Sequence, residues 1–345
     1  MTTRGIAILL SAIVCLAYSG ALQAQGGDPN YKPKRINKMI ELLESGQTVY
    51  DVSVSNAPGY EEGKKLAKTH VDLIQYQMEH GPFDPIRLRE FMQGLADGGP
   101  TKSGHRTPTV IVTLPILGLD AQTIKNNHWV IEQILGTGVH GLMLCHARNA
   151  EAVRMFVAAS RYQFERPSLK GADKGIPEGL RGSGSQRFPA SIWGISPTEY
   201  LEKADPWPMN PNGELILSLK MEDKYALANI DEITKVPGIA WGEWGPGDQA
   251  MSLMGLEYLK RGGNQGRSTA TTKATGGLPP IGEPILENAR TRIMNAMKAA
   301  GWAPLHSSNA DNIIDLIKYG IRVTHGTNVE LTNKGRAFTK RQMPY

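Results

Sequence analysis

Two carboxylates, Glu222 and Asp248, each follow a short apolar run within residues 214–255. The segment between them has the amphipathic pattern of a helix, so this stretch predicts a strand, a helix and a strand with an acid just beyond each strand. Parallel strands end at one rim of a sheet, which places both acids together. Mg²⁺ and Mn²⁺ prefer oxygen ligands and are often held by one or two protein carboxylates, with water and substrate oxygens completing the shell. The stretch therefore predicts a divalent-metal site left open for a substrate.

Each acid also has a simpler interpretation, because a carboxylate at a strand end often caps the next helix. Gly245 and Gly247, which bracket a proline before Asp248, favour the metal site, since glycine lets backbone approach a ligand closely. His80 follows another predicted strand. An imidazole group can both accept and donate a proton and so suits proton transfer, although a lone histidine is more often structural.

Apolar, β-rich segments alternate with helical patterns along the chain and must position these residues. Strands are predicted at 48–55, 71–78, 108–115 and 141–146, and helices at 60–69, 84–96, 120–135 and 149–161. Such alternation indicates parallel strands with crossover helices. The stretch 214–255 adds two strands, and 304–308 and 321–326 can add two more.

Eight alternating strands and helices in one chain predict a (β/α)₈ TIM barrel, with a doubly wound open sheet as the alternative. In a barrel, catalytic residues lie at the carboxyl ends of the strands. That rule gathers the following residues at one mouth: His80, Thr113, His146, Glu222 and Asp248.

The domain boundaries follow from composition. Residues 1–24 combine Arg4, an apolar block at 6–16 and small residues at 21–24, which predicts a cleaved export signal and a periplasmic or extracellular protein, with an uncleaved anchor as the alternative. We expect no stable membrane span after cleavage. Residues 25–34 read as a linker, 35–330 as the catalytic barrel with long loops at 162–212 and 261–284, and 331–345 as a basic C-terminal tail.

The net charge of +5 is carried by scattered residues, apart from basic runs at 32–38 and 334–341. No recognition motif accompanies these runs, so solvated faces are favoured over a nucleic-acid site. Removal of the signal would leave Cys145 without a second cysteine, so we expect it to be an inert buried residue.

The segment LILSLKMEDKYALANIDEITKVPGIAWGEWGPGDQAMSLMG resembles the HpcH/HpaI aldolase and citrate lyase family, which is metal-dependent and acts on pyruvate-type substrates. The resemblance extends upstream through DLIQYQMEHGPFD and GLRGSGSQRF and downstream through GWAPLHSSNADNIIDLIKYGIRVTHGTN. It implies a (β/α)₈ barrel of the phosphoenolpyruvate/pyruvate type, assembled as a homotrimer or homohexamer. It also implies that Glu222 and Asp248 bind Mg²⁺ or Mn²⁺.

The same resemblance assigns further residues. His80 matches the histidine of a D-G-E-H motif, and Glu79 matches its acid, which would bind metal-bound waters. Arg181 matches the arginine of a G-[IL]-R-G turn and would help to manage negative charge, or would only order its loop. His146 could enlarge the metal shell or merely close the barrel end.

Two substitutions separate this chain from the family pattern. Gln77 stands where the motif has an aspartate, and Thr113 lies near the place of an arginine that steadies the substrate's keto oxygen. Lys220 precedes Glu222 by two positions, so strand alternation points both side chains into the barrel. We expect Lys220 to replace part of the missing positive charge.

We therefore expect a metal-dependent carbon–carbon lyase that acts on 4-hydroxy-2-oxo acids or related 2-oxo acids through a stabilised enolate. One alternative keeps the metal and barrel but performs a different lyase, hydratase or oxidative reaction. Another is a non-catalytic 2-oxo-acid-binding protein. Strand alternation places Trp241 and Glu243 of the sixth strand on one face and Trp244 on the other. The two tryptophans are expected to pack rather than to stack on a ligand ring.

Overall fold

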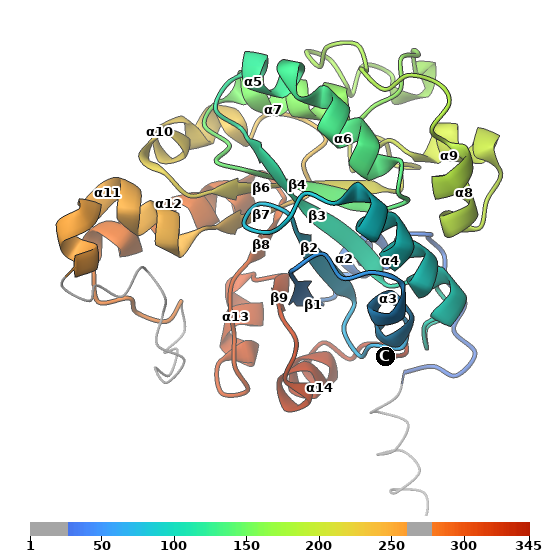
Figure 1. Ribbon diagram of the computed structural model, residues 1–345. Coiled ribbons are helices and arrows are strands. Elements are labelled where there is room, and N and C mark those ends of the chain that lie inside the picture. The colour runs from blue at the N-terminus through green and yellow to red at the C-terminus, as the bar shows by residue number, and fades with distance from the viewer. Residues whose placement is uncertain (1–26, 261–277) are drawn as a thin grey trace, which may run out of the picture.

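Eight parallel strands close into a barrel in the computed structural model, which describes residues 27–260 and 278–345 (Figure 1). The sheet order runs from β4 through β3, β2, β1, β9, β8 and β7 to β6, and pairing of β4 with β6 closes it. The barrel strands are β1 Val49–Val54, β2 Leu73–Gln77, β3 Thr109–Leu117, β4 Gly141–Cys145, β6 Leu215–Met221, β7 Trp241–Trp244, β8 Ala303–Leu305 and β9 Val323–His325. This confirms the predicted barrel and excludes the open sheet.

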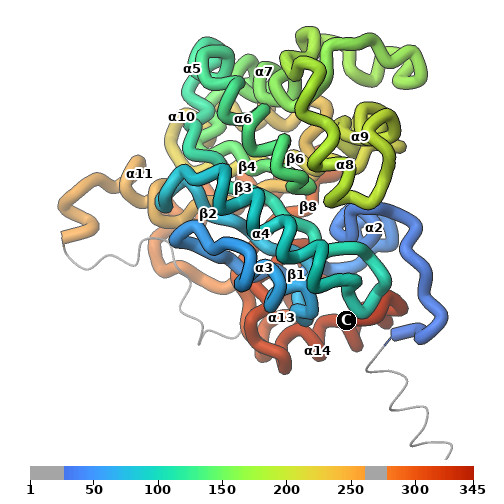
Figure 2. Tube along the Cα trace, turned by 45° about the vertical axis from the view of Figure 1, so that its right-hand side comes forward, coloured from blue at the N-terminus to red at the C-terminus, as the bar shows by residue number. Residues whose placement is uncertain are grey.

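Helices surround the barrel and return the chain from one strand to the next (Figures 1 and 2). They are α3 Tyr60–Leu66, α4 Pro85–Gly98, α5 Ala121–Asn126, α6 His128–Leu135, α7 Ala150–Ala159, α10 Lys224–Ile233, α11 Pro246–Lys260, α12 Pro284–Ala299, α13 Ile313–Tyr319 and α14 Val329–Phe338. The single helix predicted at 120–135 is two helices, because Asn127 has non-helical backbone angles (φ −113°, ψ 14°).

Side-chain caps fix where several of these helices begin. Asp84 accepts a hydrogen bond from the Arg87 N–H and precedes a proline at the first helical position, while Asp223 accepts from two backbone N–H groups of α10. Asp223 directly follows the candidate metal ligand Glu222. Its cap therefore sets where the chain turns from β6 into α10.

Two apolar layers hold the barrel together. Outward-facing strand residues pack against the helices in the larger cluster, which includes Phe91, Phe156 and Trp244. A second cluster fills the amino-terminal end of the barrel, where Trp241 is fully buried against Met39 of helix α2 (Lys38–Glu44) and other inward-facing side chains. Since α2 closes that end, the carboxyl end is left to form a site.

The segment 162–212 is a long connection between β4 with its helix α7 and strand β6, as its composition predicted. It contains a 3-10 turn at η1 Pro167–Leu169, the helices α8 Arg187–Trp193 and α9 Pro197–Lys203, and the short strand β5 Pro206–Trp207, which pairs with the start of β6. The expected signal at 1–24 and most of the loop expected at 261–284 lie outside the described residues. Within the residues that are described, no helix is both long and apolar enough to span a bilayer.

The two basic runs are not solvated faces throughout, which corrects that prediction. Asp72 is fully buried and binds Arg341 through two contacts of 2.8 and 2.6 Å, Lys38 at 2.9 Å and Arg336 at 3.8 Å. Residues 331–345 therefore form a packed part of the barrel through α14 rather than a tail. The expected linker also packs, since the Asp28 N–H donates to the Gln342 carbonyl at 2.7 Å.

Candidate active site

The predicted metal residues meet at the carboxyl end of the barrel. Glu222 follows β6, Asp248 lies in the first turn of α11 after β7, and His146 follows β4. One ligand atom from each of these three side chains lies within 4.8 Å of the other two. This is the compact set of oxygen and nitrogen donors that a divalent cation requires.

Glu222 is the buried centre of this set. Its Oε1 accepts a hydrogen bond from the His146 backbone N–H at 3.0 Å, whereas no donor among the described residues is aligned with Oε2. Burial raises the pKa of this carboxyl group. The Lys220 ammonium group faces Oε2 at 3.1 Å, so this oxygen already lies where a cation is favoured. Two carboxylates and an imidazole are donors that Mg²⁺ or Mn²⁺ accepts, so the residues fit a metal ion.

Gly245 is required by this arrangement. A Cβ atom at that position would lie 2.3 Å from Glu222 Oε2, closer than real contacts allow. A Cβ atom at Gly247 would meet no atom within 4 Å. Gly245 therefore lets the backbone pass close to Glu222, while the approach of Gly247 to a ligand stays a prediction.

Lys220 lies inside the barrel beside Glu222, as strand alternation predicts. Its Nζ is 2.9 Å from Glu79 Oε2 and 3.1 Å from Glu222 Oε2. Burial acts to lower the lysine pKa, but the nearby carboxylates of Glu222, Glu243 and Glu79 outweigh it and raise the pKa. Lys220 is thus a charged ammonium group that holds Glu79 and Glu222 together.

His146 is fixed by a neighbouring acid. Its Nδ1 lies 3.2 Å from Asp223 Oδ2, and its Nε2 lies 3.7 Å from Glu222 Oε1. The hydrogen bond to Asp223 is the main cause that raises the His146 pKa. Its backbone has a positive φ of 48°, which is uncommon outside glycine and turns the residue over the end of β4. The ring is therefore oriented towards the candidate metal residues.

His80 lines the same cavity, with its side chain 72% exposed and its Nε2 3.4 Å from Glu79 Oε2. The ring is open to solvent and to a ligand, which suits transfer of a proton. Gln77 ends β2 and is half-buried. Because its side chain is an amide, it supplies no carboxylate to the histidine. Thr113 is buried, and its hydroxyl has no hydrogen-bond partner among the described residues.

Arg181 does not reach this cavity, which corrects the prediction that it manages substrate charge. Its guanidinium group is buried 4.1 Å from the centre of the Tyr162 ring and donates to the hydroxyl groups of Tyr162 and Tyr200 at 3.0 and 3.3 Å. Both tyrosines lie in the segment 162–212 and pack within it. Arg181 therefore orders that segment.

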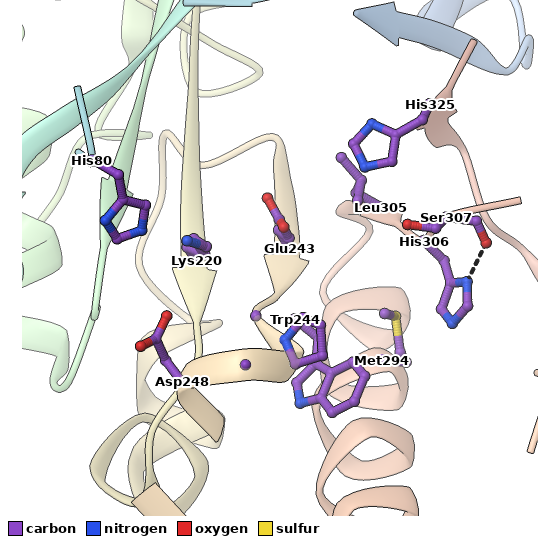
Figure 3. A pocket seen from close by; sticks show the side chains of 13 residues that line it. His80, Lys220, Glu243, Trp244, Asp248, Met294, Leu305, His306, Ser307 and His325 are labelled. Atoms are coloured by element: carbon purple, nitrogen blue, oxygen red, sulfur yellow. Dashed lines mark hydrogen bonds between the residues drawn. The ribbon is translucent and has the colours of Figure 1, made fainter. Parts of the chain in front are cut away.

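The cavity has a volume of about 530 Å³ and opens at the barrel mouth (Figure 3). Its lining comprises His80, Lys220, Glu243, Trp244, Gly245, Pro246, Gly247, Asp248, Met294, Leu305, His306, Ser307 and His325. The candidate metal ligand Asp248, the proton-transfer candidate His80 and Lys220 thus share one space.

Sequence reasoning missed the opposite wall of this cavity. Glu243 and His325 both line it, and His325 Nδ1 lies 2.6 Å from Oδ1 of the buried residue Asp51. The sequence could have predicted both residues. Strand alternation points Glu243 into the barrel with Trp241, and His325 ends the eighth barrel strand. No role was predicted for Glu243 from the sequence.

No family model matches the chain. The hydroxypyruvate/pyruvate aldolase of Cupriavidus necator is 31% identical over 187 residues, which cover 54% of this chain and 55% of that enzyme. The 2-keto-3-deoxy-L-rhamnonate aldolase of Salmonella paratyphi B is 28% identical over 81% of this chain and 83% of that enzyme.

A solved structure has a fold similar to that of this chain. An HpcH/HpaI aldolase/citrate lyase family protein from Burkholderia cenocepacia aligns with a TM-score of 0.60 and 19% identity, covering 85% of this chain and 93% of that one. The match to the Cupriavidus necator aldolase spans only about half of that enzyme's length (55%). The two aldolases confirm the resemblance found in the sequence, and the Burkholderia protein shares the fold.

Proposed function

We propose that this chain, a homologue of hydroxypyruvate/pyruvate and 2-keto-3-deoxy-L-rhamnonate aldolases, is a metal-dependent carbon–carbon lyase. Its substrates are 4-hydroxy-2-oxo acids or related 2-oxo acids. One observation carries the proposal: donor atoms of His146, Glu222 and Asp248 converge within 4.8 Å at the open end of the barrel. Active sites of this fold lie at that end.

Glu222 and Asp248 would hold Mg²⁺ or Mn²⁺, with His146 beside them. When bound, the cation would polarise the keto group of the 2-oxo acid and stabilise the enolate that forms on cleavage. Glu222 would share its Oε2 between the ion and the Lys220 ammonium group, which lies 3.1 Å from that atom.

His80 would move the proton of the substrate hydroxyl group. It is exposed in the cavity, and Glu79 Oε2 lies 3.4 Å from its Nε2, close enough to orient the ring. Lys220 would supply positive charge beside the 2-oxo acid, in place of the arginine that the family pattern has near Thr113. Since Lys220 projects from β6 between Glu79 and Glu222, it already lies beside the candidate metal ligands.

The assembly and location are further parts of the proposal. The family resemblance supports a homotrimer or homohexamer. The N-terminal pattern of Arg4, an apolar block and small residues supports export to the periplasm or beyond.

A non-catalytic 2-oxo-acid-binding protein is the second candidate, and the Lys220 ion pairs favour it. One ammonium group already pairs with both Glu79 and Glu222, so a divalent cation must share these acids with a resident positive charge. Calorimetry separates the two candidates, because a binder takes up 2-oxo acids with metal but releases no product.

The direct test measures pyruvate and aldehyde released from a panel of 4-hydroxy-2-oxo acids with Mn²⁺, with Mg²⁺ and with EDTA. We expect turnover only with metal. Absence of metal-dependent turnover across the panel, with an intact barrel by circular dichroism, contradicts the lyase proposal.

A further inference from the structure

His146 contributes a nitrogen donor to the side chains among which we place the metal ion. Its Nε2 lies 3.7 Å from Glu222 Oε1, and one donor atom each from His146, Glu222 and Asp248 lies within 4.8 Å of the other two. Two ligand atoms that each lie about 2.1 Å from one ion are separated by about 3–4 Å. The imidazole nitrogen is therefore within reach of an ion that the carboxylates bind.

A neighbouring carboxylate decides which ring nitrogen is free. Asp223 Oδ2 lies 3.2 Å from His146 Nδ1. An ionised carboxylate only accepts hydrogen bonds, so Nδ1 carries the proton and the lone pair of the neutral ring lies on Nε2. This is the nitrogen that faces Glu222. Metal-binding histidines are commonly oriented in this way, by a carboxylate that accepts from the other ring nitrogen.

Asp223 is itself fully occupied by hydrogen bonds and so holds the ring rather than an ion. Its Oδ2 also accepts from Arg148 Nε at 2.7 Å. Its Oδ1 accepts from the backbone N–H groups of Tyr225 and Ala226 at 3.0 and 2.9 Å. The carboxylate therefore has a fixed position from which it orients His146.

The backbone of His146 adds a second restraint. Its positive φ of 48° turns the chain so that its N–H donates to Glu222 Oε1 at 3.0 Å. The same residue thus fixes the Glu222 carboxylate through its backbone and faces it with its ring. No hydrogen bond joins Nε2 to another described residue, so this nitrogen is left for a ligand.

Lys220 limits what charge alone can hold at this site. Its ammonium group lies 3.1 Å from Glu222 Oε2, and Figure 3 shows the Asp248 carboxylate turned towards Lys220 and His80. A resident positive charge repels every divalent cation. Mg²⁺ gains little from an imidazole because it prefers oxygen ligands, whereas later transition metals bind nitrogen well.

We infer that His146 is a third protein ligand of the metal ion, through Nε2, and that the site therefore selects a transition metal such as Co²⁺ or Zn²⁺ over Mg²⁺. Asp223 is the positioning residue for this ligand. The inference rests on the metal site of the proposed function and does not depend on which reaction the metal supports.

Titration calorimetry with Co²⁺ and with Mg²⁺, in mildly alkaline buffer, tests the selectivity. His146→Asn removes the ring, and asparagine tolerates a positive φ. It should weaken Co²⁺ binding by at least about 100-fold, because losing a group that only orients a ligand already costs about 10–100-fold. Mg²⁺ binding should change by less than about three-fold, since Mg²⁺ gains little from nitrogen.

Asp223→Asn tests the positioning role, because asparagine still caps α10 but has one acceptor oxygen instead of two. It should weaken Co²⁺ binding by about ten-fold. His128→Gln is the control, since His128 lies on α6 outside the barrel and contacts the Lys125 carbonyl. It should leave both affinities unchanged.

Proton NMR of the Co²⁺-loaded protein gives a readout that is independent of affinity and activity. A Co²⁺-bound imidazole with a protonated Nδ1 shows an exchangeable, strongly shifted N–H signal. Wild type and His128→Gln should show this signal, and His146→Asn should lack it. Its absence from wild type overturns the inference without reference to any variant.

Equal losses of Co²⁺ and Mg²⁺ affinity in His146→Asn would also overturn the inference. Metal-dependent release of pyruvate would then still support the lyase function. Conversely, the expected selectivity and N–H signal without product from any 4-hydroxy-2-oxo acid would support His146 as a ligand and contradict the lyase function.

Discussion

The Nζ atom of Lys220 lies 3.1 Å from Oε2 of Glu222, the carboxylate oxygen that has no aligned hydrogen-bond donor among the described residues. The same ammonium group lies 2.9 Å from Glu79 Oε2. One lysine therefore pairs with two buried acids at the site where we place a divalent cation. The Lys220 ammonium group and the metal ion must therefore share the carboxylate of Glu222.

Lys220→Met should destabilise the metal-free protein, because Glu79 and Glu222 would remain buried without a counter-charge. Breaking a buried ion pair in this way costs about 3–5 kcal/mol. Added Mn²⁺ should recover much of that loss by neutralising the acids. Thermal unfolding with EDTA and with Mn²⁺ measures both effects.

Lys235→Met serves as the matched control, since Lys235 is 65% exposed and pairs with Glu232 on the surface. Its unfolding free energy should change by less than about 1 kcal/mol. If Lys220→Met leaves stability, turnover and substrate affinity all unchanged, Lys220 has no part in the site.

His80→Gln should lower kcat by about 100-fold or more, because general acid–base catalysis contributes that much. KM should change little, since the ring is exposed and holds no other residue in place. Steady-state kinetics with saturating Mn²⁺ measures both constants. A kcat within about two-fold of wild type would assign proton transfer to another group.

Asp51→Asn should return the His325 pKa from about 9 towards its ordinary value of 6.5. NMR titration of the histidine ring protons measures this directly. A His325 that titrates near 6.5 already in the wild-type protein would show that Asp51 does not hold its proton.

The same contact has a consequence for stability. Because folding raises this histidine pKa, its stabilisation is fully present below pH 6.5 and is lost as the pH rises through about 9. Solvent screening of the half-exposed ring limits the effect to about 1–2 kcal/mol. Urea unfolding at both ends of this pH range should show a smaller loss in Asp51→Asn.

Arg341→Met should destabilise the fold by about 2–4 kcal/mol, because it removes two short contacts with the buried Asp72 carboxylate. Lys38 remains 2.9 Å from Asp72 and limits the loss. Mn²⁺ affinity should not change, since this cluster lies at the closed end of the barrel. Lys340→Met should alter unfolding by less than about 0.5 kcal/mol.

Hydrophobic periodicity predicted the barrel well, because each buried strand is a short apolar run bounded by a helix pattern. The carboxylates of Glu222 and Asp248 could be placed at one mouth because the barrel topology alone brings strand ends together. The Asn127 break in the helix at 120–135 was not predictable from that periodicity. A local backbone conformation ends one helix there without interrupting the apolar face.

Contacts between residues distant in sequence were the part that could not be predicted. Arg341 and Lys38 stand at opposite ends of the chain, and only the folded barrel brings both to Asp72. Arg181 matched a family motif by its neighbours in sequence, yet its guanidinium group turns onto Tyr162 and away from the cavity. The pairing of Asp51 with His325 likewise depends on β1 closing against β9.

The central claim is that Glu222 holds a divalent cation that the lyase reaction requires. Calorimetric titration with Mn²⁺, combined with pyruvate release from 4-hydroxy-2-oxo acids, tests it on wild type, Glu222→Gln and the control Glu232→Gln, whose side chain is 64% exposed. We predict that wild type and Glu232→Gln bind Mn²⁺ and release pyruvate, while Glu222→Gln binds the ion at least about 100-fold more weakly and loses turnover. Unchanged Mn²⁺ affinity in Glu222→Gln, or equal turnover in EDTA, would contradict the claim.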